Sequence, residues 1–191
     1  MKMVALHKPA IPSARCQFAD WGSHLPTLVR LLYTFQPKRI LELGCGDWST
    51  PILHDYVTGL NDRILVSAEN NPEWLANMSW MRNAQHDMRL VSNWTAGVLG
   101  SEWDLVLVDQ APESDRIASL SYFSGVGTAK ITVLHDAQYP DRYGHLYPFF
   151  KYILHDKRYA MQTSVFSNVV DVTALYPNAV EETPCQSLLS L

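Results

Sequence analysis

The segment Arg39-Ile-Leu-Glu-Leu-Gly-Cys-Gly-Asp-Trp-Ser-Thr-Pro51 is the most informative part of this chain. An apolar run typical of a buried strand carries one carboxylate, Glu42, and ends at two alternate glycines, Gly44 and Gly46. Cap and first-turn residues of a helix follow directly. Because glycines let the backbone approach a ligand and a helix N-terminus offers free N–H groups, this strand, turn and helix predict a site for a nucleotide-like ligand.

Strand-like and helix-like segments alternate along the rest of the chain. Apolar runs at 39–43, 63–68, 88–92, 103–109 and 130–136 predict five strands, and helical periodicity predicts helices at 23–36, 51–60, 71–81, 114–123 and 146–157. In the first helix, Ser23 is the expected N-cap. Two more strands, 160–166 and 169–176, are separated only by Ser167-Asn168, which is typical of a hairpin.

This alternation predicts a doubly wound, Rossmann-like α/β fold with seven strands. Parallel strands 1–5 would be covered by helices on both faces, and the C-terminal hairpin would add two antiparallel strands. Residues 1–20 contain Pro9 and Pro12 and show no clear period, so they are interpreted as an N-terminal arm or lid. Residues 21–191 are interpreted as a single domain.

Composition limits the class of protein. The chain has 191 residues and a formal net charge of −4, and no basic run stands out, so a nucleic-acid partner is not expected. No window has the length and apolar character of a membrane span or signal core, so no membrane association is expected. Cys16, Cys45 and Cys185 form neither a zinc pattern nor a disulfide framework, which favours a cytoplasmic location. A homodimer is compatible with the sequence.

The turn favours a cationic cofactor over a dinucleotide. In a dinucleotide fingerprint a third glycine would stand at position 49, but the chain has Ser49 there, and Glu42 would repel a pyrophosphate. A cofactor with an amino group and a sulfonium would instead be attracted by that carboxylate. This is the chemistry of S-adenosylmethionine. An NAD-linked oxidoreductase on a similar sheet is the less favoured alternative.

The turn resembles motif I of the class I S-adenosylmethionine-dependent methyltransferases, especially small single-domain members whose motif reads Glu-Leu-Gly-Cys-Gly-Asp-Trp-Ser-Thr. The resemblance implies the strand order 3-2-1-4-5-7-6. The family also has an acidic residue where Glu69 ends the second strand, and its carboxylate could accept both ribose hydroxyls. The predicted cofactor-binding residues are Glu42, Gly44, Gly46, Asp47, Ser49, Thr50, Glu69, Asn93, Trp94 and Asp109.

Polar residues at the ends of strands 4 and 5 are the catalytic candidates. Asp109 follows the fourth strand, where this fold faces the methyl donor, and His135-Asp136 closes the fifth. A hydroxyl acceptor must lose its proton during attack, and a histidine is a natural base near neutral pH. If the strand stays extended, alternation places His135 and Asp136 on opposite sides, whereas a bend would bring them together.

Metal-dependent catechol-type methyltransferases offer a comparison for a metal site. They use an Asp after strand 4, an Asp-Asn pair after strand 5 and a catalytic Lys. Asp109 and Asp136 match the acids, but Ala137 and Pro112 occupy the Asn and Lys positions. These departures disfavour that scheme, although two carboxylates and water are a set that can hold a weak Mg²⁺. The chain is also similar to members with Val-Asp-Gln, a later arginine (Arg116) and His-Asp at strand 5.

The sequence therefore predicts a methyltransferase that transfers a methyl group from S-adenosylmethionine to a small-molecule acceptor, at oxygen. Tyr139, Tyr143 and Tyr147 would cover the cleft together with the N-terminal arm. The alternatives left open are a regulatory module that binds the cofactor without turnover, and a lyase or hydrolase that consumes it.

Overall fold

The computed structural model describes residues 21–94, 101–126 and 128–176, so the expected N-terminal arm lies outside it. Within these residues one seven-stranded sheet has the order β3-β2-β1-β4-β5-β7-β6. Strands β1 to β5 pair in parallel, and β7 runs antiparallel between β5 and β6. The strands are β1 (Arg39–Leu43), β2 (Ile64–Glu69), β3 (His86–Leu90), β4 (Trp103–Val108), β5 (Ala129–His135), β6 (Tyr152–Asp156) and β7 (Thr163–Ser167). The predicted fold and strand order are confirmed.

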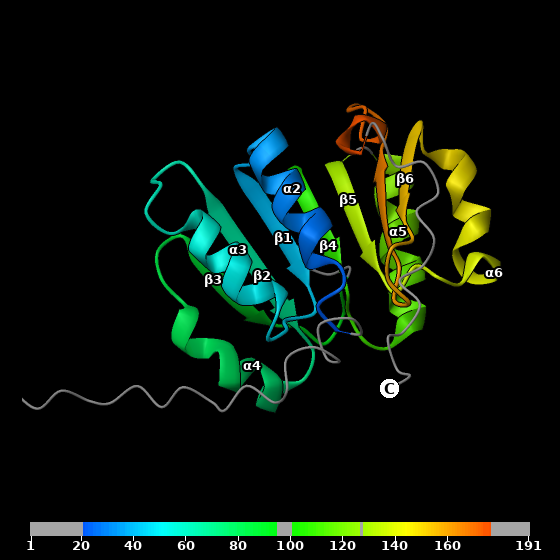
Figure 1. Cartoon of the computed structure of the whole chain (residues 1–191). Helices are drawn as coiled ribbons and strands as arrows, with labels where there is room; N and C mark the ends of the chain where they lie inside the picture. The colour runs from blue at the N-terminus through cyan, green and yellow to red at the C-terminus, as the bar shows by residue number, and fades with distance from the viewer. Residues whose placement is uncertain (1–20, 95–100, 127, 177–191) are drawn as a thin grey trace, which may run out of the picture.

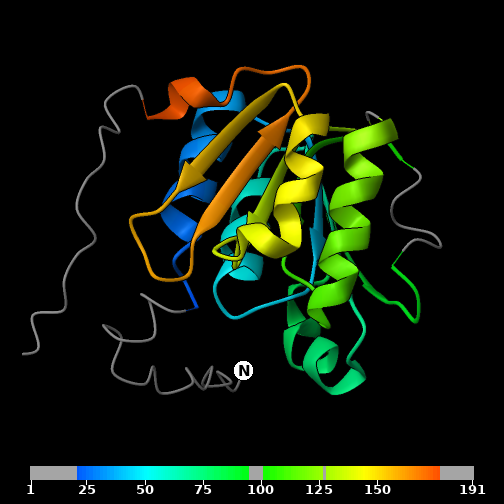
Figure 2. The same ribbon diagram turned by 90° about the vertical axis from the view of Figure 1, so that its right-hand side faces the viewer.

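Helices cover both faces of the sheet (Figures 1 and 2). One core cluster joins the sheet to α2 (Leu25–Phe35), α3 (Ser49–Val57) and the short η3 (Thr173–Leu175). A second cluster joins the other face to α5 (Glu113–Val126), α6 (Pro140–Tyr143) and η2 (Gly144–Phe149). A third lies under α4 (Pro72–Met78) and η1 (Ser79–Met81). Among the described residues, no helix has both the length and the apolar character needed to span a membrane.

The central strands are apolar on both faces because each face is covered. In β4, Leu105 and Leu107 belong to the cluster under α2 and α3, whereas Val106 and Val108 belong to the cluster under α5. All four side chains are buried. This is the pattern expected of a strand in the middle of a parallel sheet, and it holds the strand ends in fixed positions.

The prediction for the C-terminal third was wrong in detail. Residues 146–157 were expected to be helical, but Gly144–Phe149 is a 3-10 helix and Tyr152–Asp156 is strand β6. Pro148 interrupts the expected helix. Ile153 packs against one core cluster and Leu154 against the other, which is strand alternation. The hairpin is therefore β6–β7, and the region expected to form the last strand contains η3 instead.

Of the two predicted N-cap residues, Asn71 caps its helix and Ser23 does not. Asn71 caps α4 as its sequence indicates, since its side chain accepts from the N–H groups of Glu73 and Trp74. The predicted cap Ser23 does not cap α2, whose N-cap is His24 without a side-chain cap bond. Instead the hydroxyl of Ser23 lies 3.0 Å from Nε2 of His135, 112 positions away. The N-terminus of α2 is thereby joined to the end of β5.

Gly44 joins β1 to the turn in a conformation that other residues rarely adopt. Its φ is +91°, and its N–H donates to the carbonyl of Ala68 at the end of β2. A Cβ at this position would lie 2.6 Å from the carbonyl oxygen of Asp109 and 2.9 Å from Cα of Gln110. The turn therefore packs directly on the backbone that follows β4, and a side chain would separate the two.

We expect Gly44→Ala to destabilise the protein by about 2–4 kcal/mol, because positive φ and the backbone clash both oppose the methyl group. Gly59→Ala is the matched control: its φ is +92°, but a Cβ there would meet nothing within 4 Å. The control should therefore lose only about 1–2 kcal/mol. Urea unfolding of both variants measures the difference, and equal losses would contradict the close approach at Gly44.

Candidate functional site

The carboxyl ends of β1, β2, β4 and β5 lie along one edge of the sheet and carry the predicted site residues. In open α/β sheets, ligands bind beyond this edge where the strand order reverses, which here is between β1 and β4. The turn at Gly44–Gly46 follows β1, Glu69 ends β2, Asp109 follows β4 and His135 ends β5. Folding thus brings together residues that are far apart in sequence.

Glu42 lies beneath the turn and is not exposed at all. Its carboxylate accepts hydrogen bonds from the hydroxyls of Ser49 (2.6 Å), Thr50 (3.0 Å) and Ser67 (2.6 Å). Thr50 also accepts from the N–H of Gly46 at 2.8 Å. Burial raises the pKa of Glu42 to about 7, and the three hydroxyl donors oppose that rise. The carboxylate therefore fastens the β1–α3 turn to β2 from inside.

A line of side chains leads from this carboxylate to half-buried His54. Ser67 lies 2.9 Å from Nε2 of His86, and Nδ1 of His86 lies 3.1 Å from Nδ1 of His54. Burial, followed by the nearby His54, lowers the pKa of His86 to about 4, so it is neutral at pH 7. With His86 donating from Nε2 to Ser67 and accepting at Nδ1, every hydrogen bond in the line has one donor.

Glu69 holds the turn from its other side. Its Oε2 accepts from the N–H of Cys45 at 3.0 Å, and its Oε1 accepts from the N–H groups of Asn70 and Asn71 at 2.9 Å. The residue is 7% exposed, at the end of β2. Because a carboxylate can accept about four hydrogen bonds, acceptor capacity remains for a ligand hydroxyl.

The other predicted cofactor residues differ in their surroundings. Asp47 and Asn93 are exposed, whereas Trp94 is buried in the larger core cluster, so a packing role is evident for it. Sequence reasoning missed Trp74, whose indole N–H donates to the carbonyl of Cys45 at 2.6 Å. It also missed Asn70, whose amide donates to the carbonyl of Ala111 at 2.7 Å and so links the loops after β2 and β4.

Asp109 and His135 form a hydrogen-bonded pair across the ends of β4 and β5. Oδ2 of Asp109 lies 3.2 Å from Nδ1 of His135, whose ring is buried. Burial alone would raise the pKa of Asp109. The hydrogen bond and charge of His135, together with the charge of Arg116, outweigh burial, so the pKa of Asp109 is lowered. The same pair raises the pKa of His135 despite its burial.

Asp136 turns the chain so that it and His135 both reach the edge. Its φ of +57° is left-handed, which ends the strand and removes the alternation expected for an extended chain. Oδ2 of Asp136 accepts a hydrogen bond from Nη1 of Arg116 at 2.7 Å, and Nη2 of Arg116 lies 3.0 Å from Oδ1 of Asp109. Arg116 also donates from Nε to the carbonyl of Gln110 at 2.7 Å. One guanidinium thus connects both predicted catalytic carboxylates.

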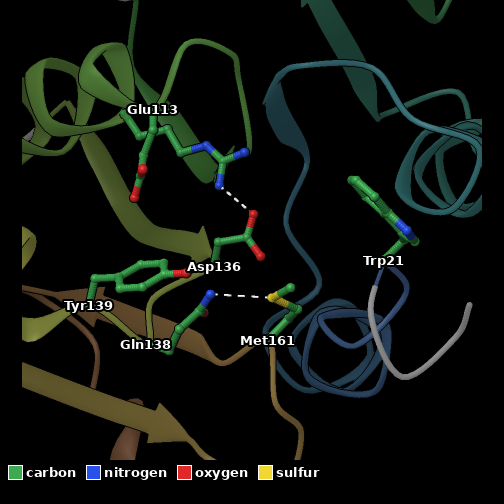
Figure 3. A pocket seen from close by; sticks show the side chains of 7 residues that line it. Trp21, Glu113, Asp136, Gln138, Tyr139 and Met161 are labelled. Carbon is green, nitrogen blue, oxygen red and sulfur yellow. Dashed lines mark hydrogen bonds and ion pairs between the residues drawn. The ribbon is translucent and has the colours of Figure 1, made fainter. Parts of the chain in front are cut away.

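A cavity of about 340 Å³ opens beside this group (Figure 3). Its lining combines charged, amide, aromatic and thioether side chains from the segment before α2, from α5, from the residues after β5 and from the β6–β7 turn: Trp21, Glu113, Arg116, Asp136, Gln138, Tyr139 and Met161. Tyr139 lines the cavity as predicted for the tyrosine group. Tyr143 and Tyr147 do not line it: Tyr143 is fully buried with its hydroxyl on Glu113, and Tyr147 packs on Phe166.

His24 completes the group and was not predicted from the sequence. Its ring lies 4.4 Å from the ring of His135 and is 1% exposed. Burial, followed by the charge of His135, lowers the pKa of His24 to about 3 although Asp109 opposes this. The only sequence signal was its place beside the expected cap Ser23, which gives no reason to join it to residues more than 80 positions away.

No family model matches the sequence, and no curated protein matches it. Among solved structures, a methyltransferase from Pyrococcus furiosus matches with a TM-score of 0.54 and 11% identity, covering 76% of this chain and 83% of that chain. The methyltransferase domain of bacterial-CtHen1-C matches with a TM-score of 0.53 and 10% identity, covering 77% and 97%.

A third match is N-methyltransferase NodS from Bradyrhizobium japonicum WM9 in complex with S-adenosyl-L-homocysteine. Its TM-score is 0.52 at 12% identity, covering 78% of this chain and 87% of that chain. The chain has the class I methyltransferase fold. At these identities the likeness establishes the architecture, and the chemistry rests on the residues at the strand ends.

The arrangement offers two distinct environments along one edge. One is a polar strip made by the Gly44–Gly46 turn, the carboxylate of Glu69 and the backbone after β4. In this strip the backbone of Gly44 packs directly against that of Asp109. The cavity beside Asp136 is bounded by a carboxylate, a guanidinium and apolar groups. Such a pair of neighbouring sites suits a reaction between a cofactor and a second, smaller molecule.

Glu42 should make the stability of the protein depend on pH. Its folded pKa of about 7 lies above the ordinary value of 4.5, so between these values the folded state keeps a proton that the unfolded chain has released. The free energy of unfolding contributed by this group therefore falls as pH rises from 4.5 to 7, by at most about 3 kcal/mol. Glu42→Gln should remove that fall.

Urea unfolding at pH 5 and pH 8 measures the effect as a difference between wild type and variant, which cancels the other titrating groups. Glu102→Gln, at an exposed position, is the matched control and should follow wild type at both pH values. Parallel pH profiles for wild type and Glu42→Gln would show that the buried carboxylate titrates as it does in the unfolded chain.

Proposed function

We propose that the protein is an S-adenosylmethionine-dependent methyltransferase that acts on a small-molecule acceptor, at an oxygen atom. The observation that carries this proposal is the Gly44–Gly46 turn at the β1–β4 switch point, held against Glu69 and the backbone of Asp109 in a methyltransferase fold. NodS, which shares this fold, has been solved with S-adenosyl-L-homocysteine. A cofactor of the same kind is therefore proposed for this chain.

The cofactor would lie across the ends of β2, β1 and β4. Glu69 would accept from the ribose hydroxyls with its remaining lone pairs, and the glycine turn would admit the methionine part next to Asp109. Asn93 and Asp47 are exposed at neighbouring loops and remain candidates for further polar contacts. Glu42, with Ser49 and Thr50 as hydrogen-bond partners, would act from beneath by fixing the turn.

The acceptor would occupy the cavity beside Asp136. A volume of about 340 Å³ lies at the lower end of the range for small-molecule pockets, and its mixed lining suits a compact organic molecule with a polar group. Of the three predicted catalytic residues, Asp136 is the one that lines this cavity. It is therefore the group best placed to touch the acceptor, while Arg116, which also pairs with Asp109, holds it in position.

The chemical step would be an in-line displacement at the methyl carbon. The carboxylate of Asp136 would take the proton of the acceptor hydroxyl as its oxygen attacks. S-adenosylmethionine, when bound, would supply the methyl group and leave as S-adenosylhomocysteine. Arg116 keeps Asp136 oriented through its contact with Oδ2, and Nε2 of His135 lies 3.7 Å from Oδ1 of Asp136. Holding both reactants together removes much of the entropic cost of their encounter.

The test is calorimetric binding of S-adenosylhomocysteine, with NAD as the competing cofactor class. We expect binding of S-adenosylhomocysteine and none of NAD. Glu69→Gln should weaken the affinity about tenfold to a hundredfold, because hydrogen bonds to a charged group contribute about 1.5–3 kcal/mol. Asp136→Asn is the matched control, since it changes a carboxylate in the acceptor cavity and should leave this affinity unchanged.

Thermal unfolding of both variants without ligand would establish whether they are folded. Binding of NAD alone, or no binding of either molecule by wild type, would overturn the proposed function. Once an acceptor is found by screening with methyl-labelled cofactor, Asp136→Asn should lower the turnover rate by about a hundredfold or more, as expected for a lost general base.

A further inference from the structure

His24, Asp109 and His135 bring three metal-binding atoms together. A ring nitrogen of each histidine and a carboxylate oxygen of Asp109 all lie within 4.8 Å of one another. They come from the start of α2, the end of β4 and the end of β5. Both histidines are buried, and Asp109 is partly buried. The group is therefore a compact, mixed nitrogen and oxygen donor set and not an exposed cluster of acids.

The side chain of His24 has no hydrogen-bond partner among the described residues. The residue is only 1% exposed, and both of its ring nitrogens are buried without a hydrogen-bond partner. A buried polar group without a partner costs about 1–3 kcal/mol, so such groups call for an explanation. His135 and the Asp109 carboxylate lie next to this ring. A bound cation would use the free lone pair of His24 and remove the cost.

Asp109 and His135 are already at the spacing that two ligands of one ion require. Oδ2 of Asp109 and Nδ1 of His135 are 3.2 Å apart, and two ligands at tetrahedral zinc with bonds near 2.0–2.1 Å lie about 3.3 Å apart. The nitrogen of His24 would have to move by on the order of 1 Å to complete the set. A rotation of its ring supplies a movement of this size.

The surrounding hydrogen bonds fit ligation. Arg116 holds Oδ1 of Asp109 at 3.0 Å, which leaves Oδ2 for an ion. Nε2 of His135 lies 3.0 Å from the hydroxyl of Ser23, so with an ion on Nδ1 this nitrogen would donate its N–H to Ser23. Ligating histidines almost always donate their second N–H to an oxygen, and such partners fix the ring and raise its basicity.

The same atoms could be read as the Ser-His-Asp series of a hydrolase, with Ser23 as nucleophile. Ser23 is fully buried, however, and it does not line the cavity. A substrate carbonyl could not reach its oxygen at the distance that attack requires. Nor does that reading give a partner to either nitrogen of His24. A metal site accounts for all three side chains.

We propose that His24, Asp109 and His135 bind one divalent transition metal ion of the zinc class, with a fourth position left for water or another oxygen ligand. Two imidazoles and one carboxylate suit zinc and its neighbours, whereas Mg²⁺ and Ca²⁺ require mainly oxygen ligands. This differs from the Asp109–Asp136 pair considered for Mg²⁺ from the sequence, because Asp136 is directed to Arg116. Metal binding here does not depend on methyl transfer.

The ion would replace the proton between Asp109 and His135 and add a ligand from the N-terminal side of α2. The ends of β4 and β5 and the start of α2 would then be joined by coordination bonds. Asp136 and Arg116, which contact this group, line the cavity shown in Figure 3. The ion would therefore place its positive charge close to the proposed acceptor site.

Calorimetric titration of chelator-treated protein with Zn²⁺ and with Mg²⁺ tests the proposal. We expect one equivalent of Zn²⁺ to bind, with no binding of Mg²⁺ at the same concentrations. His24→Gln and His135→Gln should each weaken Zn²⁺ binding at least tenfold. His54→Gln is the matched control, because His54 belongs to the separate His54–His86 contact, and its affinity should equal that of wild type.

X-ray absorption at the zinc edge of the loaded wild-type protein needs no variant, so it decides the matter even if a variant fails to fold. Two imidazole ligands and one or two oxygen ligands are expected. A sulfur ligand would overturn the proposal, as would unchanged affinity in His24→Gln or a loss confined to His54→Gln. Absence of Zn²⁺ binding by wild type would overturn it as well, whatever the outcome of cofactor binding.

Discussion

The guanidinium of Arg116 holds the ends of β4 and β5 together. It pairs with Asp109 after β4 and with Asp136 after β5, and it donates to the carbonyl of Gln110. Its side chain is only 12% exposed, so removing it would leave two carboxylates facing each other with little solvent. A planar group with five donors can hold both acids and a carbonyl at once, which lysine cannot do. The left-handed turn at Asp136 is maintained within this network.

The carboxylates of the site have different surroundings: some hold the glycine turn in place, and others lie where a ligand could contact them. Glu42 is fully buried, and its carboxyl oxygens accept hydrogen bonds from three hydroxyls, which fasten the glycine turn from beneath. Glu69 orders the same turn through the N–H groups of Cys45, Asn70 and Asn71 while remaining at the strand end. Asp136 lines the cavity. Two neighbouring environments result, one suited to a cofactor and the other to a smaller molecule, and the proposed metal ion would lie at the group that contacts Asp136.

The sequence predicted the fold well where hydrophobic runs and turn signals agreed. Strand β1 was predicted to the residue, and the Asn71 cap was confirmed. The secondary-structure prediction was wrong at residues 146–157, because the apolar residues there fit a helical period and a strand equally well until the partner strand β7 is known. The strand ends were predicted as site positions because parallel strands share an edge. The contacts of Ser23 and His24 with His135 could not be predicted, since only tertiary packing brings together residues 111 or more positions apart. The hydrogen bonds of Glu42 could not be predicted in full either, because one of its donors, Ser67, lies in the neighbouring strand.

A titration of ¹⁵N-labelled protein with S-adenosylhomocysteine, followed by amide chemical shifts, would show directly whether the cofactor binds at the ends of β1, β2 and β4. The proposed cofactor site lies at the β1–β4 switch point, where the turn packs on the backbone after β4. We therefore expect the largest shift changes at Gly44–Gly46, Glu69–Asn71 and Asp109–Ala111. Changes confined to other parts of the molecule, such as the β6–β7 hairpin, or no changes at saturating ligand, would contradict it.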